Sequence, residues 1–391
     1  MDPLPILSDL IAIPSVNPMG RALTGPEYLE TRLSEHLVRW FADRNIEHQL
    51  VEVAPGRSNV FGRVRGRGTG PSILLDAHQD TVPIDGMTID PFDPVIDGDR
   101  IYGPGACDDK GGLAGMLAAL ARLAADPEPP PGDVIMSCTC DEESTTLGVT
   151  HLVAGWQPDA SPEEWWRHKP DLAIAAEPTD LDVVVAHRGA SRWKLRTRGR
   201  ACHSSEPSNG ESAIYKMAPI LAALEEYAGL IGTRFPPHPL CGAATLSVGR
   251  IEGGVSVNTV PDECLIEIDR RVLPDEDGWE AIHDVERFLR ERVDVDFEFL
   301  PPWLVGMSLS DRTNGEMSDR LLQCIADVAG PHKKMGVPYG THASRFDAAG
   351  VPSAVFGPGS ILQAHTKDEW VPITELRQAA EVYYAFCKAG V

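Results

Sequence analysis

The hydrophobic positions in the first half of the chain follow the pattern of strands that alternate with helices. Short apolar runs bounded by polar or turn-forming residues are typical of buried strands. Between these runs, apolar residues recur at the spacing of one helix face, as in residues 26–44 and 111–125. The predicted strands cover residues 58–66, 71–78, 133–140 and 171–176. This alternation predicts a mostly parallel α/β sheet flanked by helices.

The pattern changes near residue 187. Residues 190–201 alternate polar and apolar positions, as a half-exposed strand does. The further predicted elements are helices at 211–229 and 278–292 and strands at 243–251, 262–271 and 294–300. This order of elements suits an α+β domain with a four-stranded antiparallel sheet and helices on one face.

The α/β pattern resumes toward the C-terminus, with a predicted helix at 315–329 and a strand at 353–357. A length of 391 residues also fits two domains better than one. We therefore predict a split domain formed by residues 1–186 and 302–391, with a second domain inserted at 187–301.

Composition narrows the classes of function. The formal net charge of −23 argues against nucleic acid as a partner, because phosphate backbones are bound by basic surfaces. No apolar stretch approaches the ~18–20 residues of a membrane span, and the N-terminus lacks the pattern of a secretion signal. The eight cysteines are scattered without a CxxC motif, which indicates reduced thiols. We therefore expect a cytoplasmic protein that binds neither nucleic acid nor membranes.

Histidine and carboxylate side chains follow the predicted strands at the points where they end. Sites in open α/β sheets gather at the carboxyl ends of the strands, so we expect these side chains to lie close together. The candidates are His78, Asp80, Asp108, Asp141, Glu142, Glu143, Glu177 and His365. Two histidines with three carboxylates suit zinc, cobalt or manganese and exceed what one tetrahedral zinc needs. Two divalent ions that share a bridging carboxylate fit the count better.

Eight motifs occur in the same order as in a known family. They are HQDTVP, GPGACDDKGG, CDEES, AEPT, GRACHSS, GGVSVNTVP, DRRVLP and AHTKDEW. Together they resemble the acetylornithine deacetylase, succinyl-diaminopimelate desuccinylase, aminoacylase and glutamate carboxypeptidase family of di-zinc metallohydrolases. The resemblance implies that the split domain is a metal-binding catalytic domain and that the inserted one is a lid or dimerisation domain.

The resemblance implies metal binding by five side chains. They are His78 and Glu177 for one ion, Glu143 and His365 for the other, and Asp108 as the bridge between both. Asp80 would orient the imidazole of His78, since a ligating histidine usually donates its other N–H to an acceptor. Asp109, which in similar proteins follows a cis peptide bond, would support the site without binding metal. The residues alone leave another explanation open, in which Asp108 and Asp109 cap the helix at 111–125.

The resemblance also implies roles in catalysis. Glu142 would be the general base, which takes a proton from water and hands it to the leaving amine. On a regular strand Glu142 and Glu143 would point to opposite sides. His203 resembles a histidine that the neighbouring subunit contributes to the tetrahedral oxyanion. The alternative for His203 is a loop histidine without such a role.

Substrate binding is implied for Asn258 and Arg271, which resemble groups that hold a substrate carboxylate. The planar guanidinium of arginine matches a carboxylate with two hydrogen bonds. The alternatives are that Arg271 forms a salt bridge on an edge strand, or that Arg270 binds the carboxylate instead. His342 stands where we expect relatives to carry an aspartate more often, and its role is left open.

We therefore predict an amidohydrolase with two divalent ions, zinc before cobalt or manganese, in a homodimer. A metal-bound hydroxide would attack the amide carbonyl of an N-acyl amino acid, as in a deacetylase or desuccinylase. The rival of the same class is a dipeptidase or carboxypeptidase that acts on short peptides with a free carboxylate. The rival of another class is a non-catalytic binding protein for acylated amino acids, which the presence of Glu142 and all five ligands disfavours.

Overall fold

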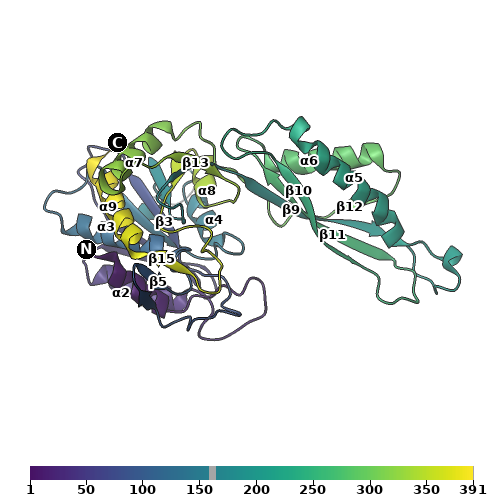
Figure 1. Ribbon diagram of the computed structural model, residues 1–391, viewed down its shortest axis with the longest axis horizontal. Coiled ribbons are helices and arrows are strands. Elements are labelled where there is room, and N and C mark those ends of the chain that lie inside the picture. Colours follow the sequence, from purple (N-terminus) through teal and green to yellow (C-terminus); the bar gives the residue numbers. More distant parts are fainter. Residues whose placement is uncertain (158–163, 391) are drawn as a thin grey trace. The chain divides into compact units, whose positions relative to one another are not determined.

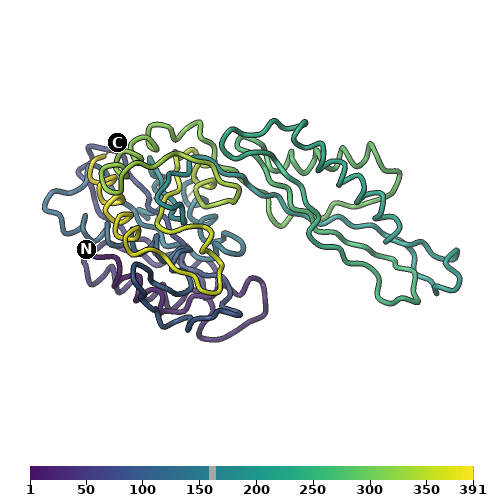
Figure 2. The backbone as a smooth tube through the Cα atoms, in the orientation of Figure 1, coloured from purple at the N-terminus to yellow at the C-terminus, as the bar shows by residue number. Residues whose placement is uncertain are grey.

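The computed structural model describes residues 1–157 and 164–390. The chain folds into two compact units (Figure 1). Unit 1 comprises Met1–Val185, Asp311–Met335 and Thr341–Val391, and unit 2 comprises Ala186–Ser310 and Gly336–Gly340. Figure 2 follows the chain from the purple N-terminal part of unit 1, through the teal and green unit 2, to the yellow C-terminal part of unit 1.

Unit 1 is built on an eight-stranded sheet with the order β1-β2-β6-β3-β7-β14-β8-β13. The strands are β1 (Glu47–Ala54), β2 (Arg57–Val64), β3 (Ile73–His78), β6 (Val134–Thr139), β7 (Leu172–Ala175), β8 (Val183–His187), β13 (Lys334–Val337) and β14 (Ser353–Val355). The central strands β6, β3, β7 and β14 are parallel, as predicted. The flanking pairs β1–β2, β2–β6 and β14–β8 are antiparallel, so the sheet is mixed.

Five helices form one core with alternate residues of these strands. They are α1 (Pro3–Ala12), α2 (Thr31–Ala42), α3 (Lys110–Ala125), α7 (Gly315–Ala329) and α9 (Ile373–Ala389). The apolar residues of α3 at helical spacing, such as Leu113, Leu117 and Leu120, are fully buried. Gly115 lets α3 approach α9 closely, since a Cβ there would lie 3.3 Å from the ring of Tyr383. This packing fixes the N-terminus of α3, which directly follows the Asp pair.

Shorter elements complete unit 1. They are α4 (Leu147–Ala154), α8 (Ala343–Ala348), the 3-10 helix Trp165–Arg167, and the strands β4 (Val95–Asp97), β5 (Arg100–Tyr102) and β15 (Trp370–Pro372). The last three strands form a small sheet of order β15-β5-β4. Because β15 pairs with β5, the loop before β15 lies beside the loop after β5, and Gly103 N donates to the carbonyl of Glu369 at 3.0 Å.

Unit 2 holds a four-stranded antiparallel sheet of order β10-β11-β9-β12. Its elements are β9 (Gly189–Arg198), β10 (Thr245–Gly253), β11 (Glu263–Val272), β12 (Glu298–Phe299), α5 (Ala213–Arg234), α6 (Gly278–Arg292) and the 3-10 helix Pro207–Asn209. One face packs apolar residues such as Trp193 and Ile266 with those of the two helices. The other carries cross-strand ion pairs, including Arg192–Asp269. The predicted α+β arrangement is therefore confirmed.

The helices and the cysteines bear on membrane-spanning character and on disulfide bonds. Within the described residues, none of the helices combines the length and the apolar character that crossing a bilayer requires. All eight cysteines fall in the described ranges and are free, and seven of them are buried.

Candidate active site

The candidate site lies at the carboxyl ends of parallel strands in unit 1. His78 is the last residue of β3, Glu143 lies in a turn after β6, and Glu177 follows β7. Asp108 lies just before α3, and His365 lies in the loop before β15. All five predicted ligands therefore belong to unit 1, although they come from separate segments of the chain.

Asp108 is the central side chain of the cluster. Its Oδ1 lies 2.9 Å from Nε2 of His78, and its Oδ2 lies 3.4 Å from Nε2 of His365. Nε2 of His365 also lies 3.2 Å from a carboxyl oxygen of Glu143. His78, Asp108 and Glu143 each offer a ligand atom within 4.8 Å of the others. The two oxygens of one carboxylate thus face two different histidines, an arrangement suited to bridging two cations.

The cluster holds several carboxylates that have little exposure to water, so their negative charges are unfavourable without nearby positive charge. Burial, together with the charges of Asp108 and Glu142, raises the pKa of Glu177 well above its ordinary value. Burial and the charge of Asp108 likewise raise the pKa of Glu143 to about 8. Buried carboxylates that repel one another ionise readily only beside positive charge. The cluster therefore fits divalent cations, and its imidazole and carboxylate donors suit zinc, cobalt or manganese.

Asp80 orders the site through both its carbonyl and its carboxylate. Nδ1 of His78 lies 2.9 Å from the backbone carbonyl of Asp80 and 3.6 Å from its Oδ1. When Nδ1–H donates a hydrogen bond to this carbonyl, Nε2 of His78 carries no proton, and its lone pair is available to bind a metal ion. The Asp80 carboxylate accepts the backbone N–H groups of Glu142 at 3.0 Å and Glu143 at 3.1 Å. Asp80 thus fixes a histidine and the two consecutive glutamates together.

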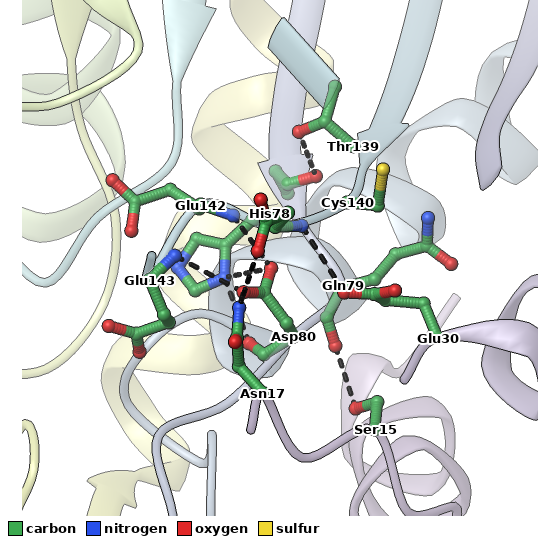
Figure 3. Close-up of polar contacts among 12 residues, drawn as sticks. Ser15, Asn17, Glu30, His78, Gln79, Asp80, Thr139, Cys140, Glu142 and Glu143 are labelled. Atoms are coloured by element: carbon green, nitrogen blue, oxygen red, sulfur yellow. Dashed lines mark hydrogen bonds and ion pairs between the residues drawn. The ribbon is translucent and has the colours of Figure 1, made fainter. Parts of the chain in front are cut away.

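Glu142 and Glu143 lie in a turn rather than on the strand. Asp141 has a φ of 61°, in the left-handed region, so the chain turns sharply after β6. The predicted alternation to opposite sides therefore does not apply. Figure 3 shows both carboxyl groups pointing away from Glu30 and from the polar contacts around Asp80.

A buried network behind Asp80 contains residues that the sequence analysis missed. The side-chain amide of Asn17 donates to Asp80 at 2.8 Å and to Asp141 at 2.9 Å. The guanidinium of Arg57 contacts Glu30 and lies 3.1 Å from Asp141. Figure 3 shows Asn17 and Glu30 converging on this network from the N-terminal segment. The partners are far apart in sequence, so no local motif signals them.

Glu369 is a second missed residue. Its buried carboxylate accepts the backbone N–H groups of Gly105 at 3.0 Å and of Cys107 and Asp108 at 2.9 Å. Three such bonds fix the course of the loop that delivers Asp108. Glu369 lies within the AHTKDEW motif, which was the one available signal.

The peptide bond between Asp108 and Asp109 is cis, as the resemblance implied. Asp109 occupies the N-cap position of α3, but among the described residues its side chain makes no capping hydrogen bond. Both of its carboxyl oxygens are buried without a partner in the described part of the chain. Helix capping therefore does not explain why the two aspartates stand together.

The remaining candidates lie in unit 2. His203 and Asn258 are exposed on adjacent segments, since Ser204 N donates to the carbonyl of Asn258 at 3.0 Å. Nδ1 of His203 lies 2.7 Å from Oγ of Ser205. The structure brings these two segments together and leaves both side chains accessible.

Arg271 lies on β11, between β10 and β9, so it is not on an edge strand, although it does form a salt bridge. It is half-buried, and its Nε donates to Oδ1 of Asp269 at 2.8 Å. The neighbouring Arg270 points to the opposite face, where it is fully buried and bound to Glu276. Of the two arginines, Arg271 is the accessible one.

Comparison with known proteins gives one consistent result. Residues 74–389 match the family model described as peptidase family M20/M25/M40. The chain is 30% identical over 394 residues to a protein named acetylornithine deacetylase from Pectobacterium carotovorum subsp. carotovorum (strain PC1), covering 97% of this chain and 96% of that protein.

Solved structures share the fold. A tripeptidase from Staphylococcus aureus has a TM-score of 0.75 and 22% identity, covering 99% of this chain and 97% of that one. A Bacillus subtilis protein described as a dinuclear metal binding peptidase has a TM-score of 0.66 and 18% identity, covering 99% of this chain and 96% of that one. At these identities the likeness supports the fold of both units.

The position of Asp108 between His78 and His365 leads to a prediction about metal content. We expect the protein to bind about two divalent ions per chain and Asp108→Ala to lose at least one of them, because the resemblance implies that both sites share this carboxylate. Elemental analysis after loading with zinc, with calorimetric titration, measures the stoichiometry. Asp97→Ala, which removes an exposed acid from β4, is the control. Unchanged metal content in Asp108→Ala would remove Asp108 from the site.

Proposed function

Since the chain belongs to the peptidase M20/M25/M40 family and is therefore a metal-dependent hydrolase, we propose that it cleaves the amide bond of N-acyl amino acids, as a deacetylase or desuccinylase does. The observation that carries the proposal is the position of Asp108, whose carboxyl oxygens face His78 and His365. The name of the Pectobacterium relative supports a deacetylase reaction.

We assign two divalent ions per chain to the cluster, with zinc preferred and cobalt or manganese accepted by the same donors. The assigned ligands are His78 and Glu177 for one ion, Glu143 and His365 for the other, and Asp108 for both. When bound, the ions supply Lewis acidity toward the amide carbonyl and toward the attacking water. Every other step of the proposal is carried by side chains of the protein.

Glu142 is the proposed general base. The bond from its backbone N–H to Asp80 holds it next to Glu143, at the edge of the metal cluster. Burial raises the pKa of Glu142, against the opposing charges of His78 and His342. A raised pKa suits a group that must both accept and release a proton near neutral pH. Glu142 would accept a proton from the attacking water and deliver it to the nitrogen of the leaving amine.

Arg271 and Asn258 are the proposed binding groups for the substrate carboxylate. The guanidinium of Arg271 is accessible on unit 2 and is held by Asp269, which leaves part of its donor fork for a ligand. A second positive charge, that of Arg188, lies near Arg271. Burial and the charge of Arg271 lower the pKa of Arg188. A local excess of positive charge favours an anionic substrate group.

The rival within the family is a peptidase. The tripeptidase from Staphylococcus aureus supports it through its name, at 22% identity. The deacetylase relative is more similar in sequence and covers nearly the whole chain, which is why we favour N-acyl amino acids. Both reactions use the same cluster and the same base, so they differ only in the groups around the amide.

We further propose a homodimer built on unit 2, which would act as a lid or dimerisation domain for the catalytic unit 1. The strand β10 is an edge of its sheet, and exposed apolar side chains lie along and beyond it, including Ile251, Val255 and Val257. Val257 also lines a cavity of ≈ 680 Å³, together with Ile214 and Tyr215. Apolar side chains at an open sheet edge are typical of protein contacts. The free cysteines suit a cytoplasmic setting.

His203 is the proposed oxyanion donor. It belongs to unit 2, whereas the metal cluster belongs to unit 1. In a dimer built on unit 2, the partner's His203 would donate a hydrogen bond to the oxygen that becomes negative during attack. The alternative is action within one chain, and mixed dimers distinguish the two.

The general base gives the first prediction of this proposal. Glu142→Gln should bind metal and substrate normally while kcat falls by about 10²–10⁴-fold or more, because the amide of glutamine cannot accept the proton. Metal content, KM and kcat are measured, with Glu52→Gln on β1 as the control. If Glu142→Gln turned over at a near-normal rate with its metal intact, another group would be the base.

The substrate class is tested by a screen of N-acetyl, N-succinyl and N-formyl amino acids and of dipeptides, each with zinc, cobalt or manganese. Every substrate is paired with its carboxamide analogue. We expect turnover of acylated amino acids with a free carboxylate. Turnover confined to dipeptides would favour the peptidase instead.

Arg271→Ala should then raise KM chiefly for substrates with a free carboxylate. Truncating one partner of a charge pair that is buried on binding, here Arg271 with the substrate carboxylate, typically costs about 2–5 kcal/mol of binding free energy. The KM values of the uncharged carboxamide analogues should change little. Arg192→Ala, which removes another partner of Asp269 from the neighbouring strand, is the matched control. Equal losses for carboxylates and carboxamides would show that Arg271 does not bind the carboxylate.

Shared active sites predict complementation between two inactive variants. His203→Ala and Glu142→Ala, mixed under conditions that exchange subunits, should recover about a quarter of the sites, because half of the dimers are mixed and one site in each is intact. Native mass spectrometry verifies the exchange. Verified exchange without returning activity would mean that His203 does not act across the dimer.

A further inference from the structure

Arg57, the first residue of β2, contacts the start of the turn that carries Glu142 and Glu143. Its guanidinium nitrogen Nη1 contacts Oε1 of Glu30, which occupies the N-cap position of α2. The same nitrogen lies 3.1 Å from Oδ1 of Asp141. Because Asp141 directly precedes the two glutamates, one buried cation joins α2 and β2 to the turn that follows β6.

The backbone of this turn is held by few regular bonds. Asp141 has a φ of 61°, and a residue other than glycine keeps such a conformation only where its surroundings fix it. The N–H of Thr146 donates to the carbonyl of Asp141 at 2.7 Å and closes the turn. The carboxylate of Asp141 is a further anchor, since it accepts Nδ2–H of Asn17 at 2.9 Å and the hydroxyl of Thr145. Arg57 adds a charged donor to this set.

The anchor brings two acids, Glu30 and Asp141, together in the interior. Their side chains are 0% and 6% exposed, and Oε1 of Glu30 accepts the backbone N–H of Asp141 at 3.2 Å. Burial and the charge of Asp80 raise the pKa of Glu30 to about 8, and the charge of Arg57 opposes this rise. Removing the cation would leave buried acids without their counter-charge, so the carboxylate of Asp141 would lose its fixed place.

We propose that Arg57 is a positioning residue, which fixes the turn after β6 through the carboxylate of Asp141. The turn presents Glu142, the proposed general base, and Glu143, a proposed metal ligand, so the inference rests on the proposed function. Asp80 holds the backbone amides of the two glutamates, whereas Arg57 holds the side chain of the residue before them. The turn is thus fixed from two independent directions.

A purely structural arginine would only stabilise the sheet. Arg63, further along β2, offers a comparison for that role, because its side chain is 12% exposed, as is that of Arg57. Its Nη2 donates to Glu47 at 2.9 Å, and Glu47 lies on the edge strand β1. Arg63→Ala removes an equally buried guanidinium from the same strand, so it is the matched control.

Arg57→Ala should lower kcat and weaken the binding of at least one metal ion, each by about 10–100-fold, as loss of a group that orients metal ligands usually does. KM should stay near wild type, because no contact with the substrate is removed. Arg63→Ala should leave kcat and metal affinity unchanged, even where it lowers the midpoint of thermal unfolding. Steady-state kinetics and calorimetric titration of the metal-free proteins measure these quantities. Normal kcat and metal affinity in Arg57→Ala, or equal losses in Arg63→Ala, would overturn the inference.

Chemical rescue separates positioning from a general loss of stability. Free guanidinium offers Glu30 and Asp141 the same planar set of donors that Arg57→Ala removes. Guanidinium chloride at millimolar concentration, far below the range that unfolds proteins, should recover part of kcat in Arg57→Ala and leave the wild type unchanged. Sodium chloride at the same concentration controls for ionic strength. Recovery that does not exceed the effect of sodium chloride would contradict the role of the guanidinium.

A second variant tests the route through Asp141 and covers the case in which Arg57→Ala does not fold. Asp141→Gly removes the carboxylate, and glycine adopts a positive φ without strain. It should reproduce the losses of kcat and metal affinity, and adding Arg57→Ala should cause little further loss, because residues that act as a unit are not additive. Normal kcat in Asp141→Gly, or additive losses, would overturn this inference and leave the general base in place. Normal kcat in Glu142→Gln would instead overturn the base itself.

Discussion

Repulsion between buried carboxylates is the constraint on which this structure depends. Asp108, Glu143 and Glu177 are brought to one edge of the sheet with little water to screen them. Two like charges about 4 Å apart repel by about 4 kcal/mol at an effective dielectric constant of ~20. Burial first, and this repulsion second, raise the pKa values of Glu143 and Glu177. The cluster becomes favourable when cations are bound, so metal binding and stability of the site are linked.

Backbone hydrogen bonds to other carboxylates hold this cluster in shape. Asp80 accepts the amides of Glu142 and Glu143, and Glu369 accepts three amides of the loop that ends at Asp108. Apart from His78, which ends β3, the candidate ligands lie on loops and turns, which regular secondary structure does not fix. Buried acids that accept several N–H groups replace the missing sheet and helix bonds. The site thus contains one set of carboxylates proposed to bind cations and another set that accepts hydrogen bonds from the backbone.

The parts that could be predicted from sequence are those with local signals. The parallel centre of the sheet and α3 follow from apolar periodicity, and the five candidate ligands follow from strand ends and ordered motifs. The flanking strand β1 was missed because its residues are mostly half-exposed and polar. Asn17, Arg57 and Glu369 were missed because each acts on a residue that is distant in sequence. The expected alternation of the two glutamates failed because the positive φ of Asp141 ends the strand first.

The environments of the acids separate those that must stay charged from those that can carry a proton. Asp80 is fully buried, yet bonds from His78, Asn17 and the amide of Glu142 lower its pKa to about 2. Such a group stays ionised and serves as a fixed acceptor. Glu142 is half-buried with fewer compensating donors, and burial raises its pKa. Pairs of acids whose surroundings push their pKa values apart mark the division of roles in an active site. Here the acid that anchors the turn and the acid proposed to move the proton are joined by one hydrogen bond, so the base is held by a neighbour that does not compete for its proton.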